Sequence, residues 1–259
     1  MAGLVTPATS DLVHIFVDYS NVIFGSRDNL NIATEYFNID LNRLIITVCN
    51  GRKLGKVFIA ASEPSPEDDL WERAKGLNFI VNVFPRNAGR EKKVDTQLTC
   101  DMMQIIHSEN PGTLILLSGD SDFAIPLNKA KEKNWKIEIW SWFIGMSNEF
   151  KKFPYVSLKD HYESFAYITE PHPTNKCSLE INDNIIKSWK WKNEPIMECF
   201  RALNLLCRFH WIDNDTNHTT AQLYFDNENK LKKARSWLKK NYPNMLVDDD
   251  PFIYVEDIE

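Results

Sequence analysis

The sequence predicts an α/β protein with a three-layer α/β/α domain, built on a central, mostly parallel five-stranded sheet, and a smaller C-terminal α+β domain. In the first 150 residues, short runs rich in Val, Ile and Phe alternate with helical stretches, which is the pattern of a parallel sheet covered on both faces. After Phe150 this alternation stops and prolines gather. We therefore expect domains at 11–150 and 179–259, joined by a connection at 151–178.

Five apolar runs are the predicted strands of the first domain. Each is four to eight residues long and rich in β-branched or aromatic residues. They are Val13–Asp18, Lys56–Ser62, Phe79–Phe84, Thr113–Ser118 and Lys136–Trp140.

Helix signals lie between these runs. Asp40 can cap one helix that Gly51 ends, and Ser65 can cap another that has Pro66 at its first position. The residues 94–107 form a third predicted helix, and a fourth follows the fourth strand. Their apolar positions share one face: Leu98, Met102, Ile105 and Ile106 in the third, and Ala124, Leu127 and Ala130 in the fourth.

The C-terminal domain is patterned differently. We expect an amphipathic helix at 195–209, a strand at 219–225, a basic helix at 228–240, a short strand at 252–255 and an acidic tail. No motif in this region names a family.

Charge does not argue against a nucleic-acid partner, although the chain of 259 residues has a net charge of −6. From Asn241 onwards there are six carboxylates and no Lys or Arg, so residues 1–240 carry 30 basic and 30 acidic residues. The acidity belongs to the tail.

Composition also indicates where the protein works. No apolar run approaches the roughly 20 residues of a spanning helix, and no signal-peptide pattern opens the chain. The five cysteines form no C-x-x-C pair, which suits neither a disulfide framework nor a zinc site. We expect an intracellular protein, cytoplasmic or nuclear, with no membrane partner.

Acidic residues gather where the strands end. The first strand runs into D-Y-S-N (Asp18 to Asn21) and the fourth into S-G-D-S-D-F (Ser118 to Phe123). Asp95 and Asp101 flank the apolar face of the helix between the third and fourth strands.

Converging carboxylates repel one another unless a cation joins them, and Mg²⁺ or Mn²⁺ prefers such oxygen ligands. A metal at this edge would suit attack on a phosphodiester. The chain has no Walker loop and no G-x-G-x-x-G, so no nucleotide cofactor is expected.

Three motifs follow one another along the chain: D-Y-S-N, the helix start K-K-V-D (Lys92 to Asp95) with Asp101 further on, and S-G-D-S-D-F. In this order they resemble the motifs of NYN domains in the PIN-like nuclease superfamily, over residues 11–150. The resemblance implies a PIN-like fold and a metal-dependent endoribonuclease that uses metal-activated water. It also implies roles for individual residues. Catalytic and metal-binding roles fall on Asp18, Asp95, Asp120 and Asp122, with Asp101 as a further metal neighbour.

The chain departs from the family at one point: Tyr19 and Ser20 stand where many relatives carry Gly-Glu, which removes one carboxylate. This leaves open whether one or two metal ions bind. The alternative prediction is a catalytically inactive module that binds RNA or protein on the same scaffold. Taken singly, the acids also have plainer roles as turn residues or helix caps.

Substrate contacts are expected at the same edge. The loop PRNAGREKK is basic and could hold phosphates of single-stranded or structured RNA, although it could also be an ordinary solvated loop. Whether a second copy of the chain or another protein also binds stays open. The predicted substrate-binding residues are Asn21, Ser118, Ser121, Arg86, Arg90, Lys92 and Lys93.

Overall fold

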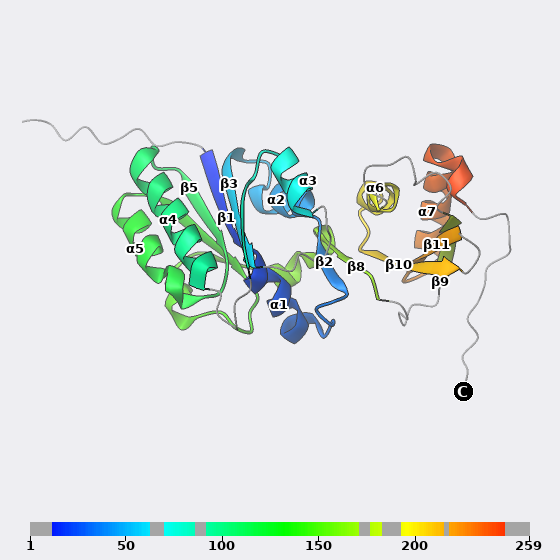
Figure 1. The fold of residues 1–259 in the computed structure, drawn as a ribbon, viewed down its shortest axis with the longest axis horizontal. Coiled ribbons are helices and arrows are strands. Elements are labelled where there is room, and N and C mark those ends of the chain that lie inside the picture. Colours follow the sequence, from blue (N-terminus) through cyan, green and yellow to red (C-terminus); the bar gives the residue numbers. More distant parts are fainter. Residues whose placement is uncertain are drawn as a thin grey trace, which may run out of the picture. The chain divides into compact units, whose positions relative to one another are not determined.

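The computed structural model describes residues 12–62, 70–85, 92–170, 177–182, 193–214 and 218–246 (Figure 1). Two compact units divide the chain. The first contains residues up to Glu35 together with Ile39–Phe165, and the second contains Tyr36–Asn38 together with the residues from Ala166. The boundary at Phe165 falls inside the segment 151–178 that the sequence marks as a connection.

A parallel sheet forms the centre of the first unit, as predicted, with strands in the order β4-β3-β1-β5-β6-β7. The prediction of five strands is wrong by one, because the three-residue β7 is too short to show a period in the sequence. The strands are β1 (Leu12–Asp18), β3 (Lys53–Ser62), β4 (Ile80–Phe84), β5 (Thr113–Leu117), β6 (Lys136–Ser141) and β7 (Tyr155–Ser157).

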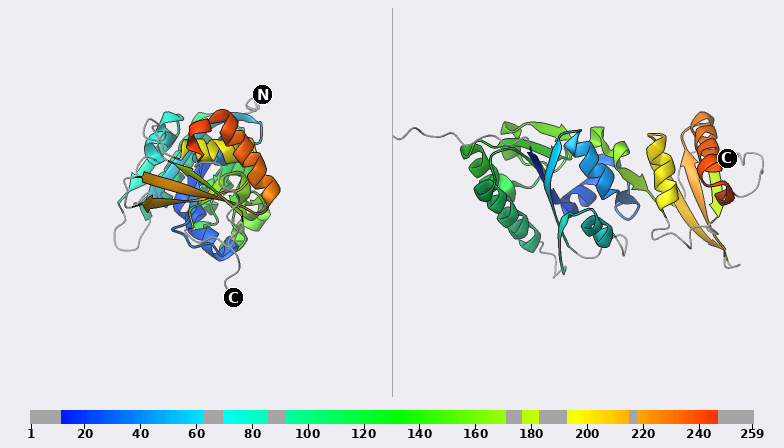
Figure 2. Two further views of the ribbon diagram at one scale, coloured as in Figure 1. Left: turned by 90° about the vertical axis from the view of Figure 1, so that its right-hand side faces the viewer. Right: turned by 90° about the horizontal axis from the view of Figure 1, so that it is seen from above.

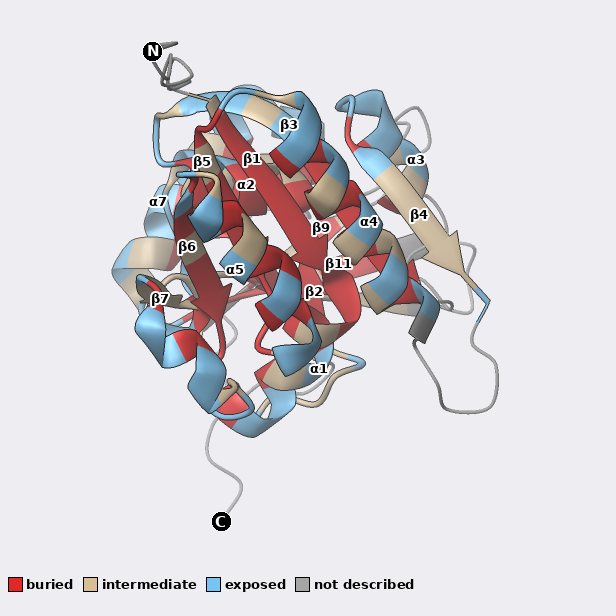
Figure 3. Cartoon of the chain, turned by 90° about the vertical axis from the view of Figure 1, so that its left-hand side faces the viewer, coloured by how far each residue is buried: buried red, intermediate tan, exposed pale blue. Residues whose placement is uncertain are grey.

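Helices cover both faces of this sheet, which gives the expected three layers (Figure 1). One face carries α1 (Tyr19–Leu30), α2 (Leu41–Cys49) and α3 (Leu70–Gly76), and the other carries α4 (Lys92–Ser108) and α5 (Ala124–Glu132). Figure 3 looks onto α4 and α5, whose outer faces are exposed while the strands behind them are buried.

The packing of α4 agrees with its predicted apolar face. Leu98, Met102 and Ile105 are buried in one cluster with residues of β1, β5 and α5. Full burial of an aliphatic side chain of this size stabilises the fold by about 1.5–3 kcal/mol. This row of contacts therefore fixes how α4 lies on the sheet, and with it the position of the acids on α4.

Caps set the ends of α2. The Asp40 side chain accepts the Arg43 N–H at 3.1 Å, as predicted for an N-cap. Asn50, with φ of 48°, ends the helix in the left-handed conformation, one residue before the predicted Gly51. The Ser65 and Pro66 signals lie outside the described residues.

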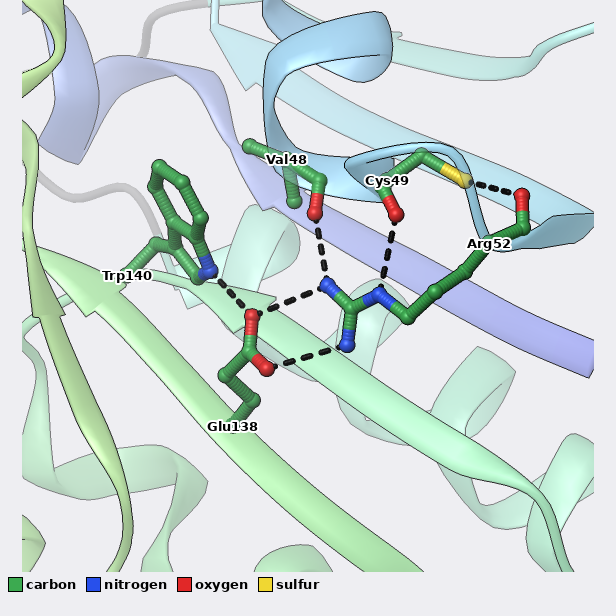
Figure 4. A network of polar contacts seen from close by, with 5 residues as sticks. All are labelled: Val48, Cys49, Arg52, Glu138 and Trp140. Atoms are coloured by element: carbon green, nitrogen blue, oxygen red, sulfur yellow. Dashed lines mark hydrogen bonds and ion pairs between the residues drawn. The ribbon is translucent and has the colours of Figure 1, made fainter.

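A polar network joins the C-terminal end of α2 to β6 (Figure 4). The Arg52 guanidinium donates to both Glu138 carboxylate oxygens, at 3.0 and 3.2 Å, and to the carbonyls of Val48 and Cys49. The indole of Trp140 donates to the same carboxylate. One guanidinium thus satisfies two carbonyls at a helix end that would otherwise lack partners.

The second unit has its own sheet, in the order β2-β8-β10-β11-β9. Figure 2 gives two more views of the chain, in which β10 and β11 form a twisted antiparallel pair. The strands are β2 (Phe37–Ile39), β8 (Ala166–Ile168), β9 (Cys177–Asn182), β10 (Cys207–Asn214) and β11 (His218–Phe225).

The helices of this unit correct one prediction. The helix predicted at 195–209 is wrong at its end: α6 (Glu194–Ala202) stops before Asn204, whose φ of 51° breaks it, and residues 207–209 begin β10. The strand at 219–225 and the basic helix agree with β11 and α7 (Glu228–Asn241). The strand predicted at 252–255 lies outside the described residues. None of the described helices is long and apolar enough to span a membrane.

Candidate active site at the carboxyl ends of β1 and β5

The strand order of the first sheet indicates where a ligand should bind. From β1 the chain proceeds to β3 and β4 on one side, and it then crosses to β5 and β6 on the other side. In open parallel sheets, ligands bind at the carboxyl ends of the strands where the order reverses in this way. Here that point lies between the ends of β1 and β5, where Asp18 and Ser118 are found.

Asp18 is the last residue of β1 and the N-cap of α1. It is buried, and its two oxygens each accept one hydrogen bond. One takes the backbone N–H of Asn21 at 3.1 Å, and the other takes the Ser118 hydroxyl at 3.1 Å. These bonds fix the orientation of the carboxylate.

Asn21 ties the two strand ends together. Its side-chain oxygen accepts the backbone N–H of Gly119 at 3.0 Å. A side chain at position 119 would meet the Ser141 hydroxyl at 2.8 Å and the Gly145 carbonyl at 3.1 Å, so only glycine fits without a shift. Asn21 thus holds the backbone after β5 in place, and Ser118 holds the carboxylate of Asp18.

The two acids after β5 lie differently. Asp120 is partly exposed and caps the short helix η1 (Ser121–Phe123), because its side chain accepts the Asp122 N–H at 3.0 Å. It lines the pocket described below. Asp122 and Ser121 are exposed and are not among the residues that line this pocket.

The two acids of α4 also separate. Asp95, in the first turn, is half-buried and lines the same pocket as Asp18 and Asp120. Asp101 lies six residues further along the helix and does not line it. One oxygen of Asp101 accepts the Gln97 amide at 2.9 Å, and burial raises the pKa of its carboxyl group.

A pocket of about 340 Å³ opens at this edge of the sheet, a volume that suits a ligand of nucleotide size. Most of the residues that line this pocket were not predicted from the sequence. Besides Asp18, Asn21, Asp95 and Asp120, it is lined by Ser20, Phe24, Gly25, Arg27 and Asp28 from α1, by Ser141 and by Trp142, Ile144 and Gly145 from the segment after β6.

Helix α1 holds this last segment in place. The buried Trp142 indole donates to the Val22 carbonyl at 2.7 Å. The Asn29 side chain accepts the Ile144 N–H at 3.0 Å and donates to the Ile144 carbonyl at 3.2 Å. Gly25 faces the Trp142 ring, where an added Cβ would lie 2.1 Å from its Cδ1 atom. The pocket wall after β6 is therefore a fixed structure.

The oxygen-rich lining fits a hard divalent cation in its chemistry. Asp18, Asp95 and Asp120 supply carboxylates, and the described residues that line the pocket include neither His nor Cys. In the described part of the chain, however, no three His, Cys, Asp or Glu side chains gather closely enough to hold a metal ion. The structure thus brings three of the predicted acids to one pocket, but their carboxylates are not close enough together to form a metal site.

The predicted basic contacts are described only in part. Arg86 and Arg90 lie outside the described residues, as does the side chain of Lys92. Lys93 is exposed near the start of α4. Arg27, a pocket-lining cation that sequence reasoning missed, pairs with Asp28 at 3.0 Å.

Comparison with known protein families adds one result: the family model of the NYN domain matches residues 12–158. This match covers more than half of the chain and includes β1, α4, β5 and the segment after β6. Comparison with curated proteins gives no match.

Proposed function

Because the chain belongs to the NYN domain family, a family of PIN-like nucleases, we propose that it is a metal-dependent endoribonuclease. The observation that carries the proposal is the meeting of Asp18, Asp95 and Asp120, from three separate elements, in the lining of one pocket at the switch point of the sheet.

These three carboxylates would hold Mg²⁺ or Mn²⁺, whereas the other two predicted acids, Asp122 and Asp101, do not line the pocket. When bound, the metal supplies a hydroxide-like water and neutralises charge on the phosphate. The roles of the protein's own groups follow from their contacts. The Ser118 hydroxyl and the Asn21 N–H fix the orientation of the Asp18 carboxylate. The partly exposed Asp120 can accept a hydrogen bond from the attacking water.

The test is cleavage of end-labelled RNA and of a circular RNA by the purified chain in Mn²⁺, with EDTA as the negative control. A circle has no ends, so its opening reports endonucleolytic cleavage. We expect Asp18→Asn and Asp120→Asn to lower the rate by about a hundredfold or more, the order of loss when a group that stabilises the transition state is removed. Asn is as good an N-cap as Asp, so the helices they begin should survive.

Asp160→Asn is the matched control, since Asp160 is exposed and does not line the pocket. Its rate should equal that of the wild type. Cleavage that is unchanged in Asp120→Asn, or no cleavage of any RNA tried, would contradict the proposal.

The second candidate is a catalytically inactive module that binds RNA or protein. Two observations favour it: Asp18 and Asp120 both serve as helix caps, and the described acids form no closed metal cage. Calorimetric titration with Mn²⁺ separates the two. The nuclease should bind the metal and lose this binding in Asp18→Asn, whereas the inactive module should release no heat.

A further inference from the structure

Two exposed apolar side chains line the acidic pocket, Phe24 and Ile144, and a third, Phe143, is the chain neighbour of Ile144; we call these three residues the apolar rim. Their exposed fractions are 44%, 72% and 56%. Phe24 and Ile144 line the pocket, and Phe143 lies between the pocket-lining residues Trp142 and Ile144. Single exposed apolar residues are ordinary, but a group at the edge of a site indicates a partner.

The residues before and after Phe143 are both anchored to α1. Before it, Trp142 is 1% exposed and hydrogen-bonded to α1 through the Val22 carbonyl. After it, both backbone groups of Ile144 are bonded to the Asn29 side chain. The backbone that carries Phe143 is therefore held on both sides by hydrogen bonds to α1.

The charge of the pocket explains why such a surface is useful to a site for nucleic acid. Among the described residues, four carboxylates line the pocket, those of Asp18, Asp28, Asp95 and Asp120, against the guanidinium of Arg27. Without a bound metal, these carboxylates repel a phosphate backbone. Affinity gained from the bases does not depend on charge, and it offsets that repulsion.

Aromatic side chains bind bases by stacking, and this needs bases whose faces are free. A single strand offers such faces and a duplex does not. Resting on the proposed function, we infer that the apolar rim is a stacking surface for unpaired bases that flank the bond to be cut. The site would thus select single-stranded segments of RNA.

Fluorescence anisotropy with a labelled single-stranded RNA in EDTA, where no turnover occurs, tests this inference. Phe143→Ala should weaken binding by about five- to 150-fold, the range for loss of one stacked base. Phe143→Trp should bind within about threefold of the wild type, because the larger ring still stacks. Ile46→Ala removes another exposed apolar side chain (62%, against 72% for Phe143) that does not line this pocket, and RNA affinity should stay unchanged.

An RNA with abasic nucleotides completes the test. The wild type should bind it as weakly as Phe143→Ala binds the intact strand, and Phe143→Ala should show no further loss. Equal losses on both RNAs, no loss at all, or equally tight binding of the matching duplex would overturn the inference. So would a dimer in sedimentation that Phe143→Ala dissociates while RNA binding stays the same, because the rim would then bind a second copy.

The inference and the proposed function can fail separately. Base-dependent binding without cleavage in Mn²⁺ would remove the nuclease and leave the stacking surface. Cleavage with the same KM in Phe143→Ala as in the wild type would keep the nuclease and remove the stacking surface.

Discussion

Gly25→Ala should destabilise the first unit because α1 packs against Trp142 at this glycine. An alanine Cβ would lie 2.1 Å from Cδ1 and 2.8 Å from Nε1 of the indole, both well inside van der Waals contact. The ring is 1% exposed, so it cannot move aside into solvent. The clash must be relieved by shifting α1 or the segment after β6.

The size of the effect follows from three contributions. Overpacking of a filled core costs about 1–3 kcal/mol. Separating the Trp142 N–H from the Val22 carbonyl, 2.7 Å apart, leaves a buried donor and costs about 1–3 kcal/mol. Alanine recovers about 1 kcal/mol through its better helix propensity. We therefore expect the free energy of unfolding to fall by about 3 kcal/mol.

Urea unfolding followed by circular dichroism measures this change. Gly76→Ala is the control, because a Cβ at the end of α3 meets nothing within 4 Å, and its stability should equal that of the wild type or slightly exceed it. A Gly25→Ala variant within about 0.5 kcal/mol of the wild type would refute the packing argument.

Three further predictions concern charged groups. Burial lowers the pKa of His14, so the unfolded chain takes up the proton first as pH falls below about 6.5, and stability should decline from pH 7 to pH 5. In His14→Gln, this part of the unfolding curve should be flatter. Glu138→Ala should lower stability by about 1–3 kcal/mol, because it removes the two bonds from the half-buried Arg52 to a carboxylate, whereas Glu132→Ala, which breaks an exposed pair, should stay within about 0.5 kcal/mol. Burial raises the pKa of Asp101, so its ionisation opposes folding as pH rises through the folded-state pKa. Asp101→Asn should thus raise stability at pH 7 and lose this advantage at pH 3, and weaker Mn²⁺ binding in this variant would instead mark Asp101 as a metal ligand.

The sequence was most informative where local pattern and topology coincide. A buried parallel strand is typically a run of Val, Ile and Leu, so β1, β3, β4, β5 and β6 were predictable, and a parallel sheet places their carboxyl ends at one edge. That is why Asp18 and Asp120 could be expected together. Helix α1 was not predicted, since Ser20, Ser26 and Asn29 interrupt its buried face with polar side chains. The strands β2, β7 and β8 have three residues each and no readable period.

The segment after β6 shows why the rest of the site could not be predicted. In the sequence, Trp142, Phe143 and Ile144 form one apolar run with no sign of which side chain is buried. The choice depends on Gly25, more than 100 residues away, whose missing side chain leaves room for the indole. A contact of this kind leaves no pattern in either segment.

Helix α1 therefore contacts both parts of the proposed site, the acid at the end of β1 and the apolar segment after β6. Asp18 caps its N-terminus, Gly25 admits Trp142 at its middle, and Asn29 holds Ile144 near its end. A shift of α1 should disturb the apolar rim as much as removal of the Phe143 ring does. Gly25→Ala and Phe143→Ala should therefore lose similar affinity for single-stranded RNA, while only Gly25→Ala loses stability. Full affinity in a destabilised Gly25→Ala would show that the rim does not depend on α1.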